Sequence, residues 1–190
     1  MPGAIIDFGE CVGVDMSEDS RTATDALAGP WNRPEAVPRR AVGAPGVIEI
    51  LLVEDSPADA ELALQVLKEA NVHSNLSIVG DGEAALDFLH RRPPYADSPR
   101  PDLILLDLNL PRKDGREVLG ELKQTDGLRQ IPVVVLSASP AEEDIADAYE
   151  KHANAYIKKP VGLNDFVMCV RLVEAFWLGL VCLPSAGRPT

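Results

Sequence analysis

Five short, almost uninterrupted apolar runs, each followed by a segment with helical features, constrain the fold of this chain most strongly. The runs suited to strands cover residues 47–53, 76–79, 103–107, 131–136 and 155–157. One segment that favours a helix begins after Ser56, and the others cover residues 82–89, 115–124, 142–151 and 163–178. Continuous apolar runs are typical of strands buried on both faces of a sheet. The alternation therefore predicts an α/β fold, with helices covering both faces of a parallel sheet.

The two ends of the chain differ from this regular part. Residues 1–46 hold 6 of the 14 glycines and 5 of the 16 prolines without a sustained apolar period, so we expect an irregular or disordered extension. Residues 47–184 form the expected domain, and residues 185–190 form a short tail. The longest apolar run near the C-terminus has nine residues, 175–183, whereas a membrane span needs about 20. Because the N-terminus also lacks the features of a signal peptide, we expect a soluble, cytoplasmic protein.

Charge and cysteine content exclude several classes of protein. The net charge is −12, which argues against broad contact with nucleic acid or with an anionic membrane, because both require a basic surface. The three cysteines, Cys11, Cys169 and Cys182, are far apart and include no Cys-x-x-Cys pair. This spacing excludes a disulfide scaffold and a thiolate zinc site.

Charged and hydroxyl side chains stand where the predicted strands end. Glu54 and Asp55 follow the first strand, Asp107 ends the third, and Ser137 follows the fourth. The fifth strand is followed by residues 158–160, Lys-Lys-Pro, so that Lys158 and Lys159 both compete for a role at this edge. Because parallel strands end at one edge of the sheet, these side chains are expected to converge there.

The convergence of three carboxylates suggests a specific chemistry. Crowded carboxylates repel one another, and burial increases the repulsion. Mg²⁺ relieves it, because this ion binds one or two carboxylates together with waters and a phosphate. An ionised aspartate can also act as a nucleophile, and Mg²⁺, a lysine and a small hydroxyl suit the charge of a transferred phosphoryl group. The residues therefore predict an aspartyl-phosphate site with Mg²⁺ as cofactor.

These residues resemble the receiver domains of two-component response regulators over residues 47–183. The matching features are the acidic pair Glu54-Asp55, Asp107 with its following loop, Ser137-Ala138, Tyr156 and Lys159-Pro160. The spacings match as well, with 52 residues from Asp55 to Asp107, 30 from Asp107 to Ser137 and 52 from Asp107 to Lys159. The resemblance implies a doubly wound, flavodoxin-like (βα)5 fold with five parallel strands in the order 2-1-3-4-5.

The resemblance also implies a role for each site residue. It makes Asp107 the phosphoacceptor, Lys159 and Ser137 its catalytic partners, and Ser137 and Tyr156 the switch residues, although an aromatic residue such as Tyr156 can also simply pack in the core. The implied Mg²⁺ ligands are Asp55, Asp107, the backbone carbonyl of Asn109 and, through a water, Glu54. A cis peptide bond before Pro160 is a further implication.

A narrower resemblance links the chain to small single-domain regulators that pair with bacterial and cyanobacterial phytochromes. It rests on the Pro-rich insert 91–101 and on the C-terminal Phe-Trp-Leu at residues 176–178, among other segments. It implies a sensor histidine kinase, in particular a phytochrome kinase, as partner and a homodimer as the assembly. The residues that would form the dimer surface, or else dock onto the domain's own core, are Phe176, Trp177, Leu180, Val181 and Leu183.

The expected function is that of a stand-alone response regulator that is not a turnover enzyme. The sequence leaves three alternative functions to consider. A phosphatase of the haloacid dehalogenase type needs a second aspartate two residues after the nucleophile, where this chain has Asn109. A transcription factor needs a DNA-binding module, and only six residues follow Pro184, while residues 1–46 are not basic. A receiver-like module that binds partners without being phosphorylated stays the main alternative.

Overall fold

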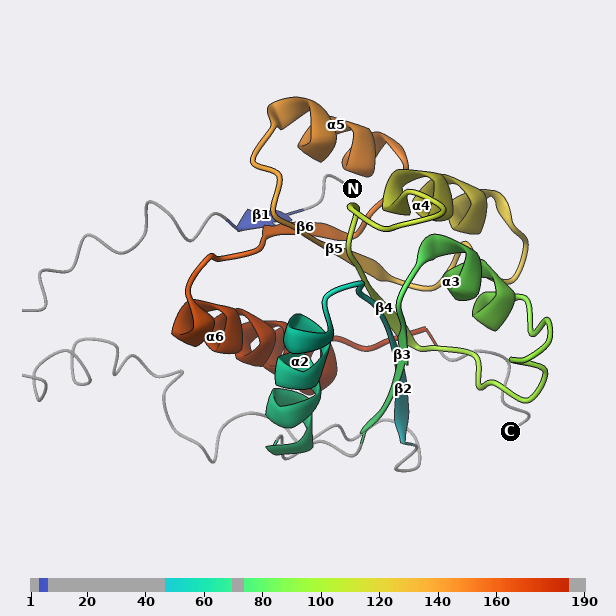
Figure 1. Ribbon diagram of the computed structural model, residues 1–190, viewed down its shortest axis with the longest axis horizontal. Helices are drawn as coiled ribbons and strands as arrows, with labels where there is room; N and C mark the ends of the chain where they lie inside the picture. Colours follow the sequence, from blue (N-terminus) through green and yellow to red (C-terminus); the bar gives the residue numbers. More distant parts are fainter. Residues whose placement is uncertain (1–3, 7–46, 70–73, 185–190) are drawn as a thin grey trace, which may run out of the picture.

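A six-stranded parallel sheet forms the centre of the protein, and helices cover both of its faces (Figure 1). This computed structural model describes residues 4–6, 47–69 and 74–184. In these ranges the strands are β1 (Ala4–Ile6), β2 (Ile48–Val53), β3 (Ser74–Val79), β4 (Leu103–Leu106), β5 (Val133–Ser137) and β6 (Ala155–Lys158). Their order across the sheet is β1-β6-β5-β4-β2-β3.

The five strands predicted from the sequence have the predicted arrangement. Counted from β2 onward, their order is 2-1-3-4-5, and every neighbouring pair is parallel. The central strands read as continuous apolar runs because they are covered on both faces, and all four residues of β4 are buried. The structure thus confirms the doubly wound, flavodoxin-like fold.

The structure differs from the sequence prediction near the N-terminus. Within the segment that we expected to be irregular, Ala4–Ile6 forms β1 and pairs in parallel with β6, so that Ile5 lies opposite Tyr156. A strand of three residues is too short to show an alternating pattern, and its pairing depends on the free edge that β6 offers. Residues 1–3, 7–46 and 185–190 of the expected extension and tail lie outside the described residues.

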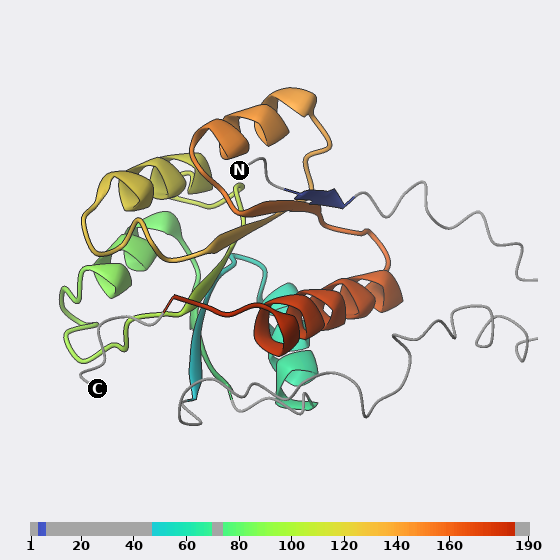
Figure 2. The same cartoon turned by 180° about the vertical axis from the view of Figure 1, so that it is seen from behind.

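Two layers of helices enclose the sheet, as the two opposite views show (Figures 1 and 2). The helices α2 (Pro57–Glu69) and α6 (Leu163–Glu174) cover one face. The helices α3 (Gly82–Leu89), α4 (Gly115–Gln124) and α5 (Glu142–Glu150) cover the other. The helix predicted to run to residue 178 changes into a π-helical segment at Ala175–Leu180, where Val181 N donates to Phe176 O at 2.9 Å, five residues back.

Polar side chains at the carboxyl ends of the strands begin several helices. Ser56 caps α2 as predicted, because its Oγ accepts a hydrogen bond from Asp59 N at 3.3 Å. Asp81 caps α3 by accepting from Ala84 N at 2.8 Å. Asp114 and Glu117 form a reciprocal capping box at the start of α4. Helix starts are therefore fixed at the edge of the sheet where the candidate site lies.

The core consists of two apolar layers, one on each face of the sheet. Successive side chains of β4 alternate between the layers, so that Ile104 and Leu106 face α3, α4 and α5 while Leu103 and Leu105 face α2 and α6. The two layers cover the central strands, whereas the edge strand β3 stays partly exposed, with Ile78 at 40%. None of the helices in the described residues combines the length and apolar character that crossing a membrane requires.

Substitution of a buried leucine tests this packing. Leu105 lies in a central strand and is 1% exposed. We expect Leu105→Ala to lower the free energy of unfolding by about 2–5 kcal/mol, because the lost methyl groups leave a cavity. Val161→Ala is the control, since Val161 is fully exposed, and should change stability by less than about 0.5 kcal/mol. Equal effects of the two substitutions in urea unfolding would contradict the described packing.

Candidate functional site

Backbone hydrogen bonds place the first residues after the strands at one edge of the sheet. Asp107 N donates to Val53 O at 3.0 Å, and Lys159 N donates to Ser137 O at 2.8 Å. Each bond continues the pairing of a ladder by one step beyond the strand. The positions of Asp107 and Lys159 relative to Ser137 are thus fixed by strand register and do not depend on loop conformation.

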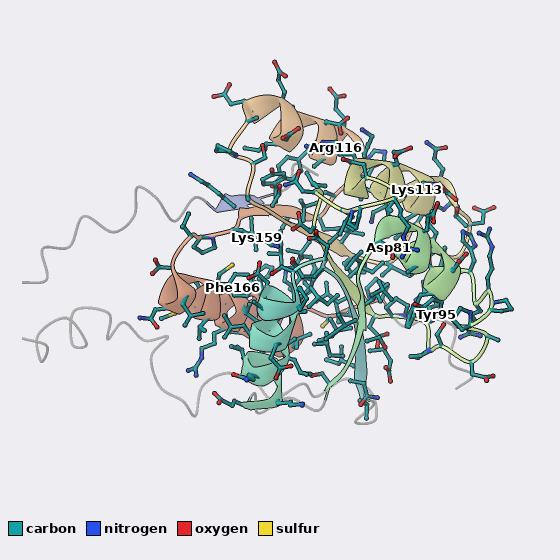
Figure 3. All side chains as sticks on the ribbon, viewed as in Figure 1. Asp81, Tyr95, Lys113, Arg116, Lys159 and Phe166 are labelled. Carbon is teal, nitrogen blue, oxygen red and sulfur yellow. The ribbon has the colours of Figure 1, made fainter. Side chains whose placement is uncertain are left out.

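The ammonium group of Lys159 is the centre of the site, and Figure 3 shows its position at the carboxyl edge of the sheet. Its Nζ lies 2.5 Å from Glu54 Oε2, 2.6 Å from Asp107 Oδ2 and 3.4 Å from Asp59 Oδ2. The side chains of Lys159, Glu54 and Asp107 are 9%, 2% and 7% exposed. Two buried carboxylates therefore share one buried cation.

Burial and charge shift the protonation equilibria of this group. Burial raises the pKa of Glu54 above its usual value, and the charge of Asp107 adds to this, whereas Lys159 acts in the opposite direction. Burial by itself lowers the pKa of Lys159, but its hydrogen bonds to Asp107 and Glu54 outweigh that effect, and the net pKa is raised. Lys159 is consequently a cation throughout the physiological pH range.

Three carboxylates in the site are arranged so that they fit a divalent cation. Oxygen atoms of Glu54, Asp55 and Asp107 all lie within 4.8 Å of one another. The Asp55 side chain is exposed. Both carboxylate oxygens of Glu54 already accept hydrogen bonds, Oε1 from Ser56 N at 3.2 Å and Oε2 from Lys159 Nζ. Carboxylate oxygens suit a hard cation, and the occupied oxygens of Glu54 fit an indirect contact through water better than a direct one.

The loop that follows Asp107 folds back tightly against the site. Asn109 N donates to Asp107 Oδ1 at 2.9 Å, so both oxygens of the Asp107 carboxylate have a donor. A Cβ atom at Gly115 would overlap Asp107 O, so a larger residue there would displace the loop. Arg112, which has a positive φ of 65°, forms an ion pair with the buried Asp81 at the start of α3. These contacts hold the Asn109 backbone close to the carboxylates.

A second network lies beside the site, on the side of β5 and β6. Ser137 is fully buried, and its Oγ accepts a hydrogen bond from Ser139 N at 3.2 Å. Tyr156 is 1% exposed, and its hydroxyl donates to Ser139 O at 2.8 Å. Ser139 Oγ donates to Asp144 Oδ2 at 2.5 Å, and Asp144 forms an ion pair with Arg116 at 2.7 Å. Ser137 is therefore linked through Ser139 to β6, α4 and α5.

The structure brings together the residues that the sequence singled out, and it decides between the two lysines. Lys159 contacts the carboxylates, whereas Lys158 is exposed at the end of β6. The expectation of a cis bond before Pro160 is wrong, because the cis bond in the described residues is Pro93–Pro94. The contact between Asp59 and Lys159 was not predicted from the sequence.

Removal of the buried ammonium tests the electrostatics of the site. We expect Lys159→Met to lower the free energy of unfolding by about 3 kcal/mol at pH 8, because two buried carboxylates lose their cation. Without that cation, burial and the charge of Asp107 raise the pKa of Glu54 further above its value in the unfolded chain, so the stability of the variant falls as the pH rises through that range. The deficit should therefore be smaller at pH 5 than at pH 8.

Urea unfolding across this pH range measures the effect, with Lys158→Met as the control at an exposed lysine. A deficit that is constant with pH would mean that packing of the Lys159 chain, and not its charge, is what the substitution removes.

Comparison with known proteins places this geometry in a family. Residues 50–171 match the response regulator receiver domain. Over 137 residues the chain is 53% identical to the response regulator Rcp1 of Synechocystis sp.. This alignment covers 72% of the chain and 93% of Rcp1. A structure of the Mn(2+)-bound form of Rcp1 is 51% identical, with a TM-score of 0.71 over 73% of this chain and 99% of that chain.

A second solved structure, of the phosphorylated cyanobacterial phytochrome response regulator RcpA, is 46% identical to the chain. Its TM-score is 0.72, over 74% of this chain and 100% of that chain. Receiver domains bind a divalent metal at an acidic pocket, which here corresponds to Glu54, Asp55 and Asp107. The family match, the identities and the strand order together show that the chain belongs to the response regulator receiver family of two-component systems.

Proposed function

We propose that this protein is a response regulator that accepts a phosphoryl group on Asp107 from a phosphohistidine of a sensor histidine kinase. The observation that carries this proposal is the burial of the Asp107 carboxylate and the charged groups that surround it. It is almost buried, it lies 2.6 Å from the Lys159 ammonium, and it shares its surroundings with Glu54 and Asp55. A nucleophilic carboxylate beside a fixed cation and a metal-binding cluster is suited to phosphoryl transfer.

In the transfer step, an oxygen of Asp107 forms a bond to phosphorus while the phosphorus–nitrogen bond of the phosphohistidine breaks. The electron pair of that bond returns to the imidazole ring of the kinase. Lys159, already within hydrogen-bonding distance of Asp107, donates to an oxygen of the incoming phosphoryl group. Asp55, Asp107 and the backbone carbonyl of Asn109, with Glu54 acting through a water, would hold Mg²⁺, and this ion would supply neutralising charge when bound. No metabolite is turned over.

The switch that follows uses the network around Ser137. Its hydroxyl turns toward the phosphoryl group and gives up the hydrogen bond from Ser139 N. Ser139 also accepts from Tyr156 and donates to Asp144, so its movement changes the contacts of β6 and α5. The phosphoryl charge of about −1.5 to −2 is large enough to bias two such arrangements. The output is then read by a protein partner that contacts this face.

The kinase that phosphorylates the protein is proposed from its relatives. Solved relatives include a cyanobacterial phytochrome response regulator and the bacteriophytochrome response regulator AtBRR, 46% and 39% identical to the chain. We therefore propose a phytochrome-type histidine kinase as donor, acting in the cytoplasm. The strongly acidic net charge of −12 gives no support for a nucleic acid or a membrane as partner.

Phosphorylation in vitro tests the proposed function. We expect incubation with acetyl phosphate and Mg²⁺ to add the mass of one phosphoryl group, because Lys159 and the metal neutralise the incoming charge. Removal of Mg²⁺ with EDTA or the substitution Asp107→Asn should abolish the addition, as measured by intact-protein mass spectrometry. Asp97→Asn is the control, because Asp97 is an exposed residue in the loop after α3.

The outcome separates the proposal from its alternatives. If neither acetyl phosphate nor a phosphorylated phytochrome kinase modifies the wild type, the protein is a receiver-like module that binds without phosphorylation. Rapid, repeated release of inorganic phosphate would instead indicate a phosphatase.

We further propose that the protein forms a homodimer through α6 and the π-helical segment. Four apolar residues lie at a spacing of four along this surface, Met168, Leu172, Phe176 and Leu180, and they are 56%, 43%, 51% and 64% exposed. Trp177, Val181 and Leu183 instead pack on the core beside α2 and α6, which is the docking role that the sequence left open for them. An exposed apolar stripe of this length favours contact with another helix.

A charged residue within the stripe tests the dimer. We expect Phe176→Glu and Leu180→Glu to lower the fraction of dimer at least tenfold, since an unpaired carboxylate at an apolar interface costs more than about 1.4 kcal/mol. Light scattering after size exclusion, with and without acetyl phosphate, measures this fraction. Val47→Glu is the control at another exposed apolar residue. A wild type that is monomeric in both states would contradict the proposal.

A further inference from the structure

Lys159 has a third carboxylate partner to which the proposed reaction gives no role. Asp59 lies in the first turn of α2, with its Oδ2 at 3.4 Å from Lys159 Nζ and its side chain 38% exposed. The hydrogen bond from Asp59 N to Ser56 Oγ, at 3.3 Å, fixes the backbone of this turn. Asp59 therefore reaches the lysine from outside the sheet, whereas Glu54 and Asp107 approach it from the strand ends.

The proposed reaction changes the charge of Asp107, one partner of Lys159, and gives Glu54, a second partner, a role at the metal. Asp107 loses its negative charge when it becomes an acyl phosphate, because one of its oxygens is then bonded to phosphorus. Glu54 belongs to the acidic cluster that would hold a divalent cation. Asp59 is not a member of that cluster, so its carboxylate stays available to Lys159 throughout the reaction.

We propose that Asp59 is a positioning residue for Lys159. Its carboxylate holds the ammonium group at the edge of the site while Asp107 is being phosphorylated, so that another N–H of Lys159 points to the phosphoryl oxygen. An ammonium group has three donors, which allows both contacts at once. This inference rests on the proposed phosphorylation of Asp107 and adds a residue that governs its rate.

The sign of the effect separates positioning from simple electrostatics. A negative charge near the site repels anionic acetyl phosphate. If this repulsion were the only effect of Asp59, its removal would accelerate phosphorylation. Loss of a positioning contact would slow it. Because Asp59 is partly exposed and its contact with Lys159 is long, we expect a moderate effect, a three- to fivefold decrease in the rate constant at saturating Mg²⁺.

Asp59→Asn is the test variant, and Asp87→Asn is a closely matched control. Asp87 lies in α3, has a side chain that is also 38% exposed, and is also 3.4 Å from its cationic partner, Arg92. Both substitutions remove one charge at the same exposure. The expected result is a slower rate for Asp59→Asn, an unchanged rate for Asp87→Asn and a largely restored rate for Asp59→Glu, which keeps the carboxylate.

A double-mutant cycle with Lys159→Met shows whether Asp59 acts through the lysine. With Mg²⁺ present, Asp59→Asn should no longer slow the residual phosphorylation of Lys159→Met. Without metal, the effects of the two substitutions on thermal unfolding should be non-additive, which reports on the contact independently of activity. Additive effects in both measurements, or a faster Asp59→Asn, would overturn the inference.

The two proposals fail in different ways. If wild type is not phosphorylated at all, the proposed function is wrong, whereas the metal-free unfolding cycle still measures the contact. If wild type is phosphorylated and Asp59→Asn reacts at the rate of Asp87→Asn, the proposed function stands and the role of Asp59 is wrong.

Discussion

A single buried ammonium group makes the carboxylate-rich edge of this sheet possible. Glu54 and Asp107 converge because the parallel strands end together, and without Lys159 their mutual repulsion would oppose folding. The compensation is incomplete. Glu54, Asp59 and Asp107 contact Lys159, and Asp55 lies beside two of them, so four carboxylates and one lysine leave a formal charge of −3. A site with this excess charge is stable enough to fold and still attracts a divalent cation.

The residues that sequence reasoning located correctly are those whose position depends on strand register. In a parallel sheet, the polar residues that follow each apolar run lie at the same edge, so Asp107, Ser137 and one of the two lysines after the last run could be placed together from the sequence. The structure shows that Lys159 is the lysine that contacts the carboxylates. The strand order needed the family resemblance. It could not come from the alternation, which is compatible with several orders of five strands.

The contacts that escaped prediction depend on how helices rotate against the sheet. Asp59 and Lys159 are 100 residues apart, and their contact requires a particular orientation of the first turn of α2. The ion pair between Arg116 and Asp144 similarly joins the starts of two helices. No periodicity in a sequence encodes such a rotation, because it results from packing of the whole apolar face. The strand β1 was missed for a related reason, since it exists only by pairing with β6.

The arrangement that we propose for the formation of an acyl phosphate would give little help to its hydrolysis. Hydrolysis needs a group that can activate water or protonate the leaving carboxylate. Near Asp107 both oxygens of Glu54 already accept hydrogen bonds, and Asp55 belongs to the cluster that would hold a cation. Lys159 is held cationic by its partners, and the side-chain amide of Asn109 does not transfer protons. Under the proposed function, a phosphoryl group on Asp107 would therefore persist long enough to shift the contacts of Ser137 and Tyr156, which is what a signalling domain requires and what a phosphatase must avoid.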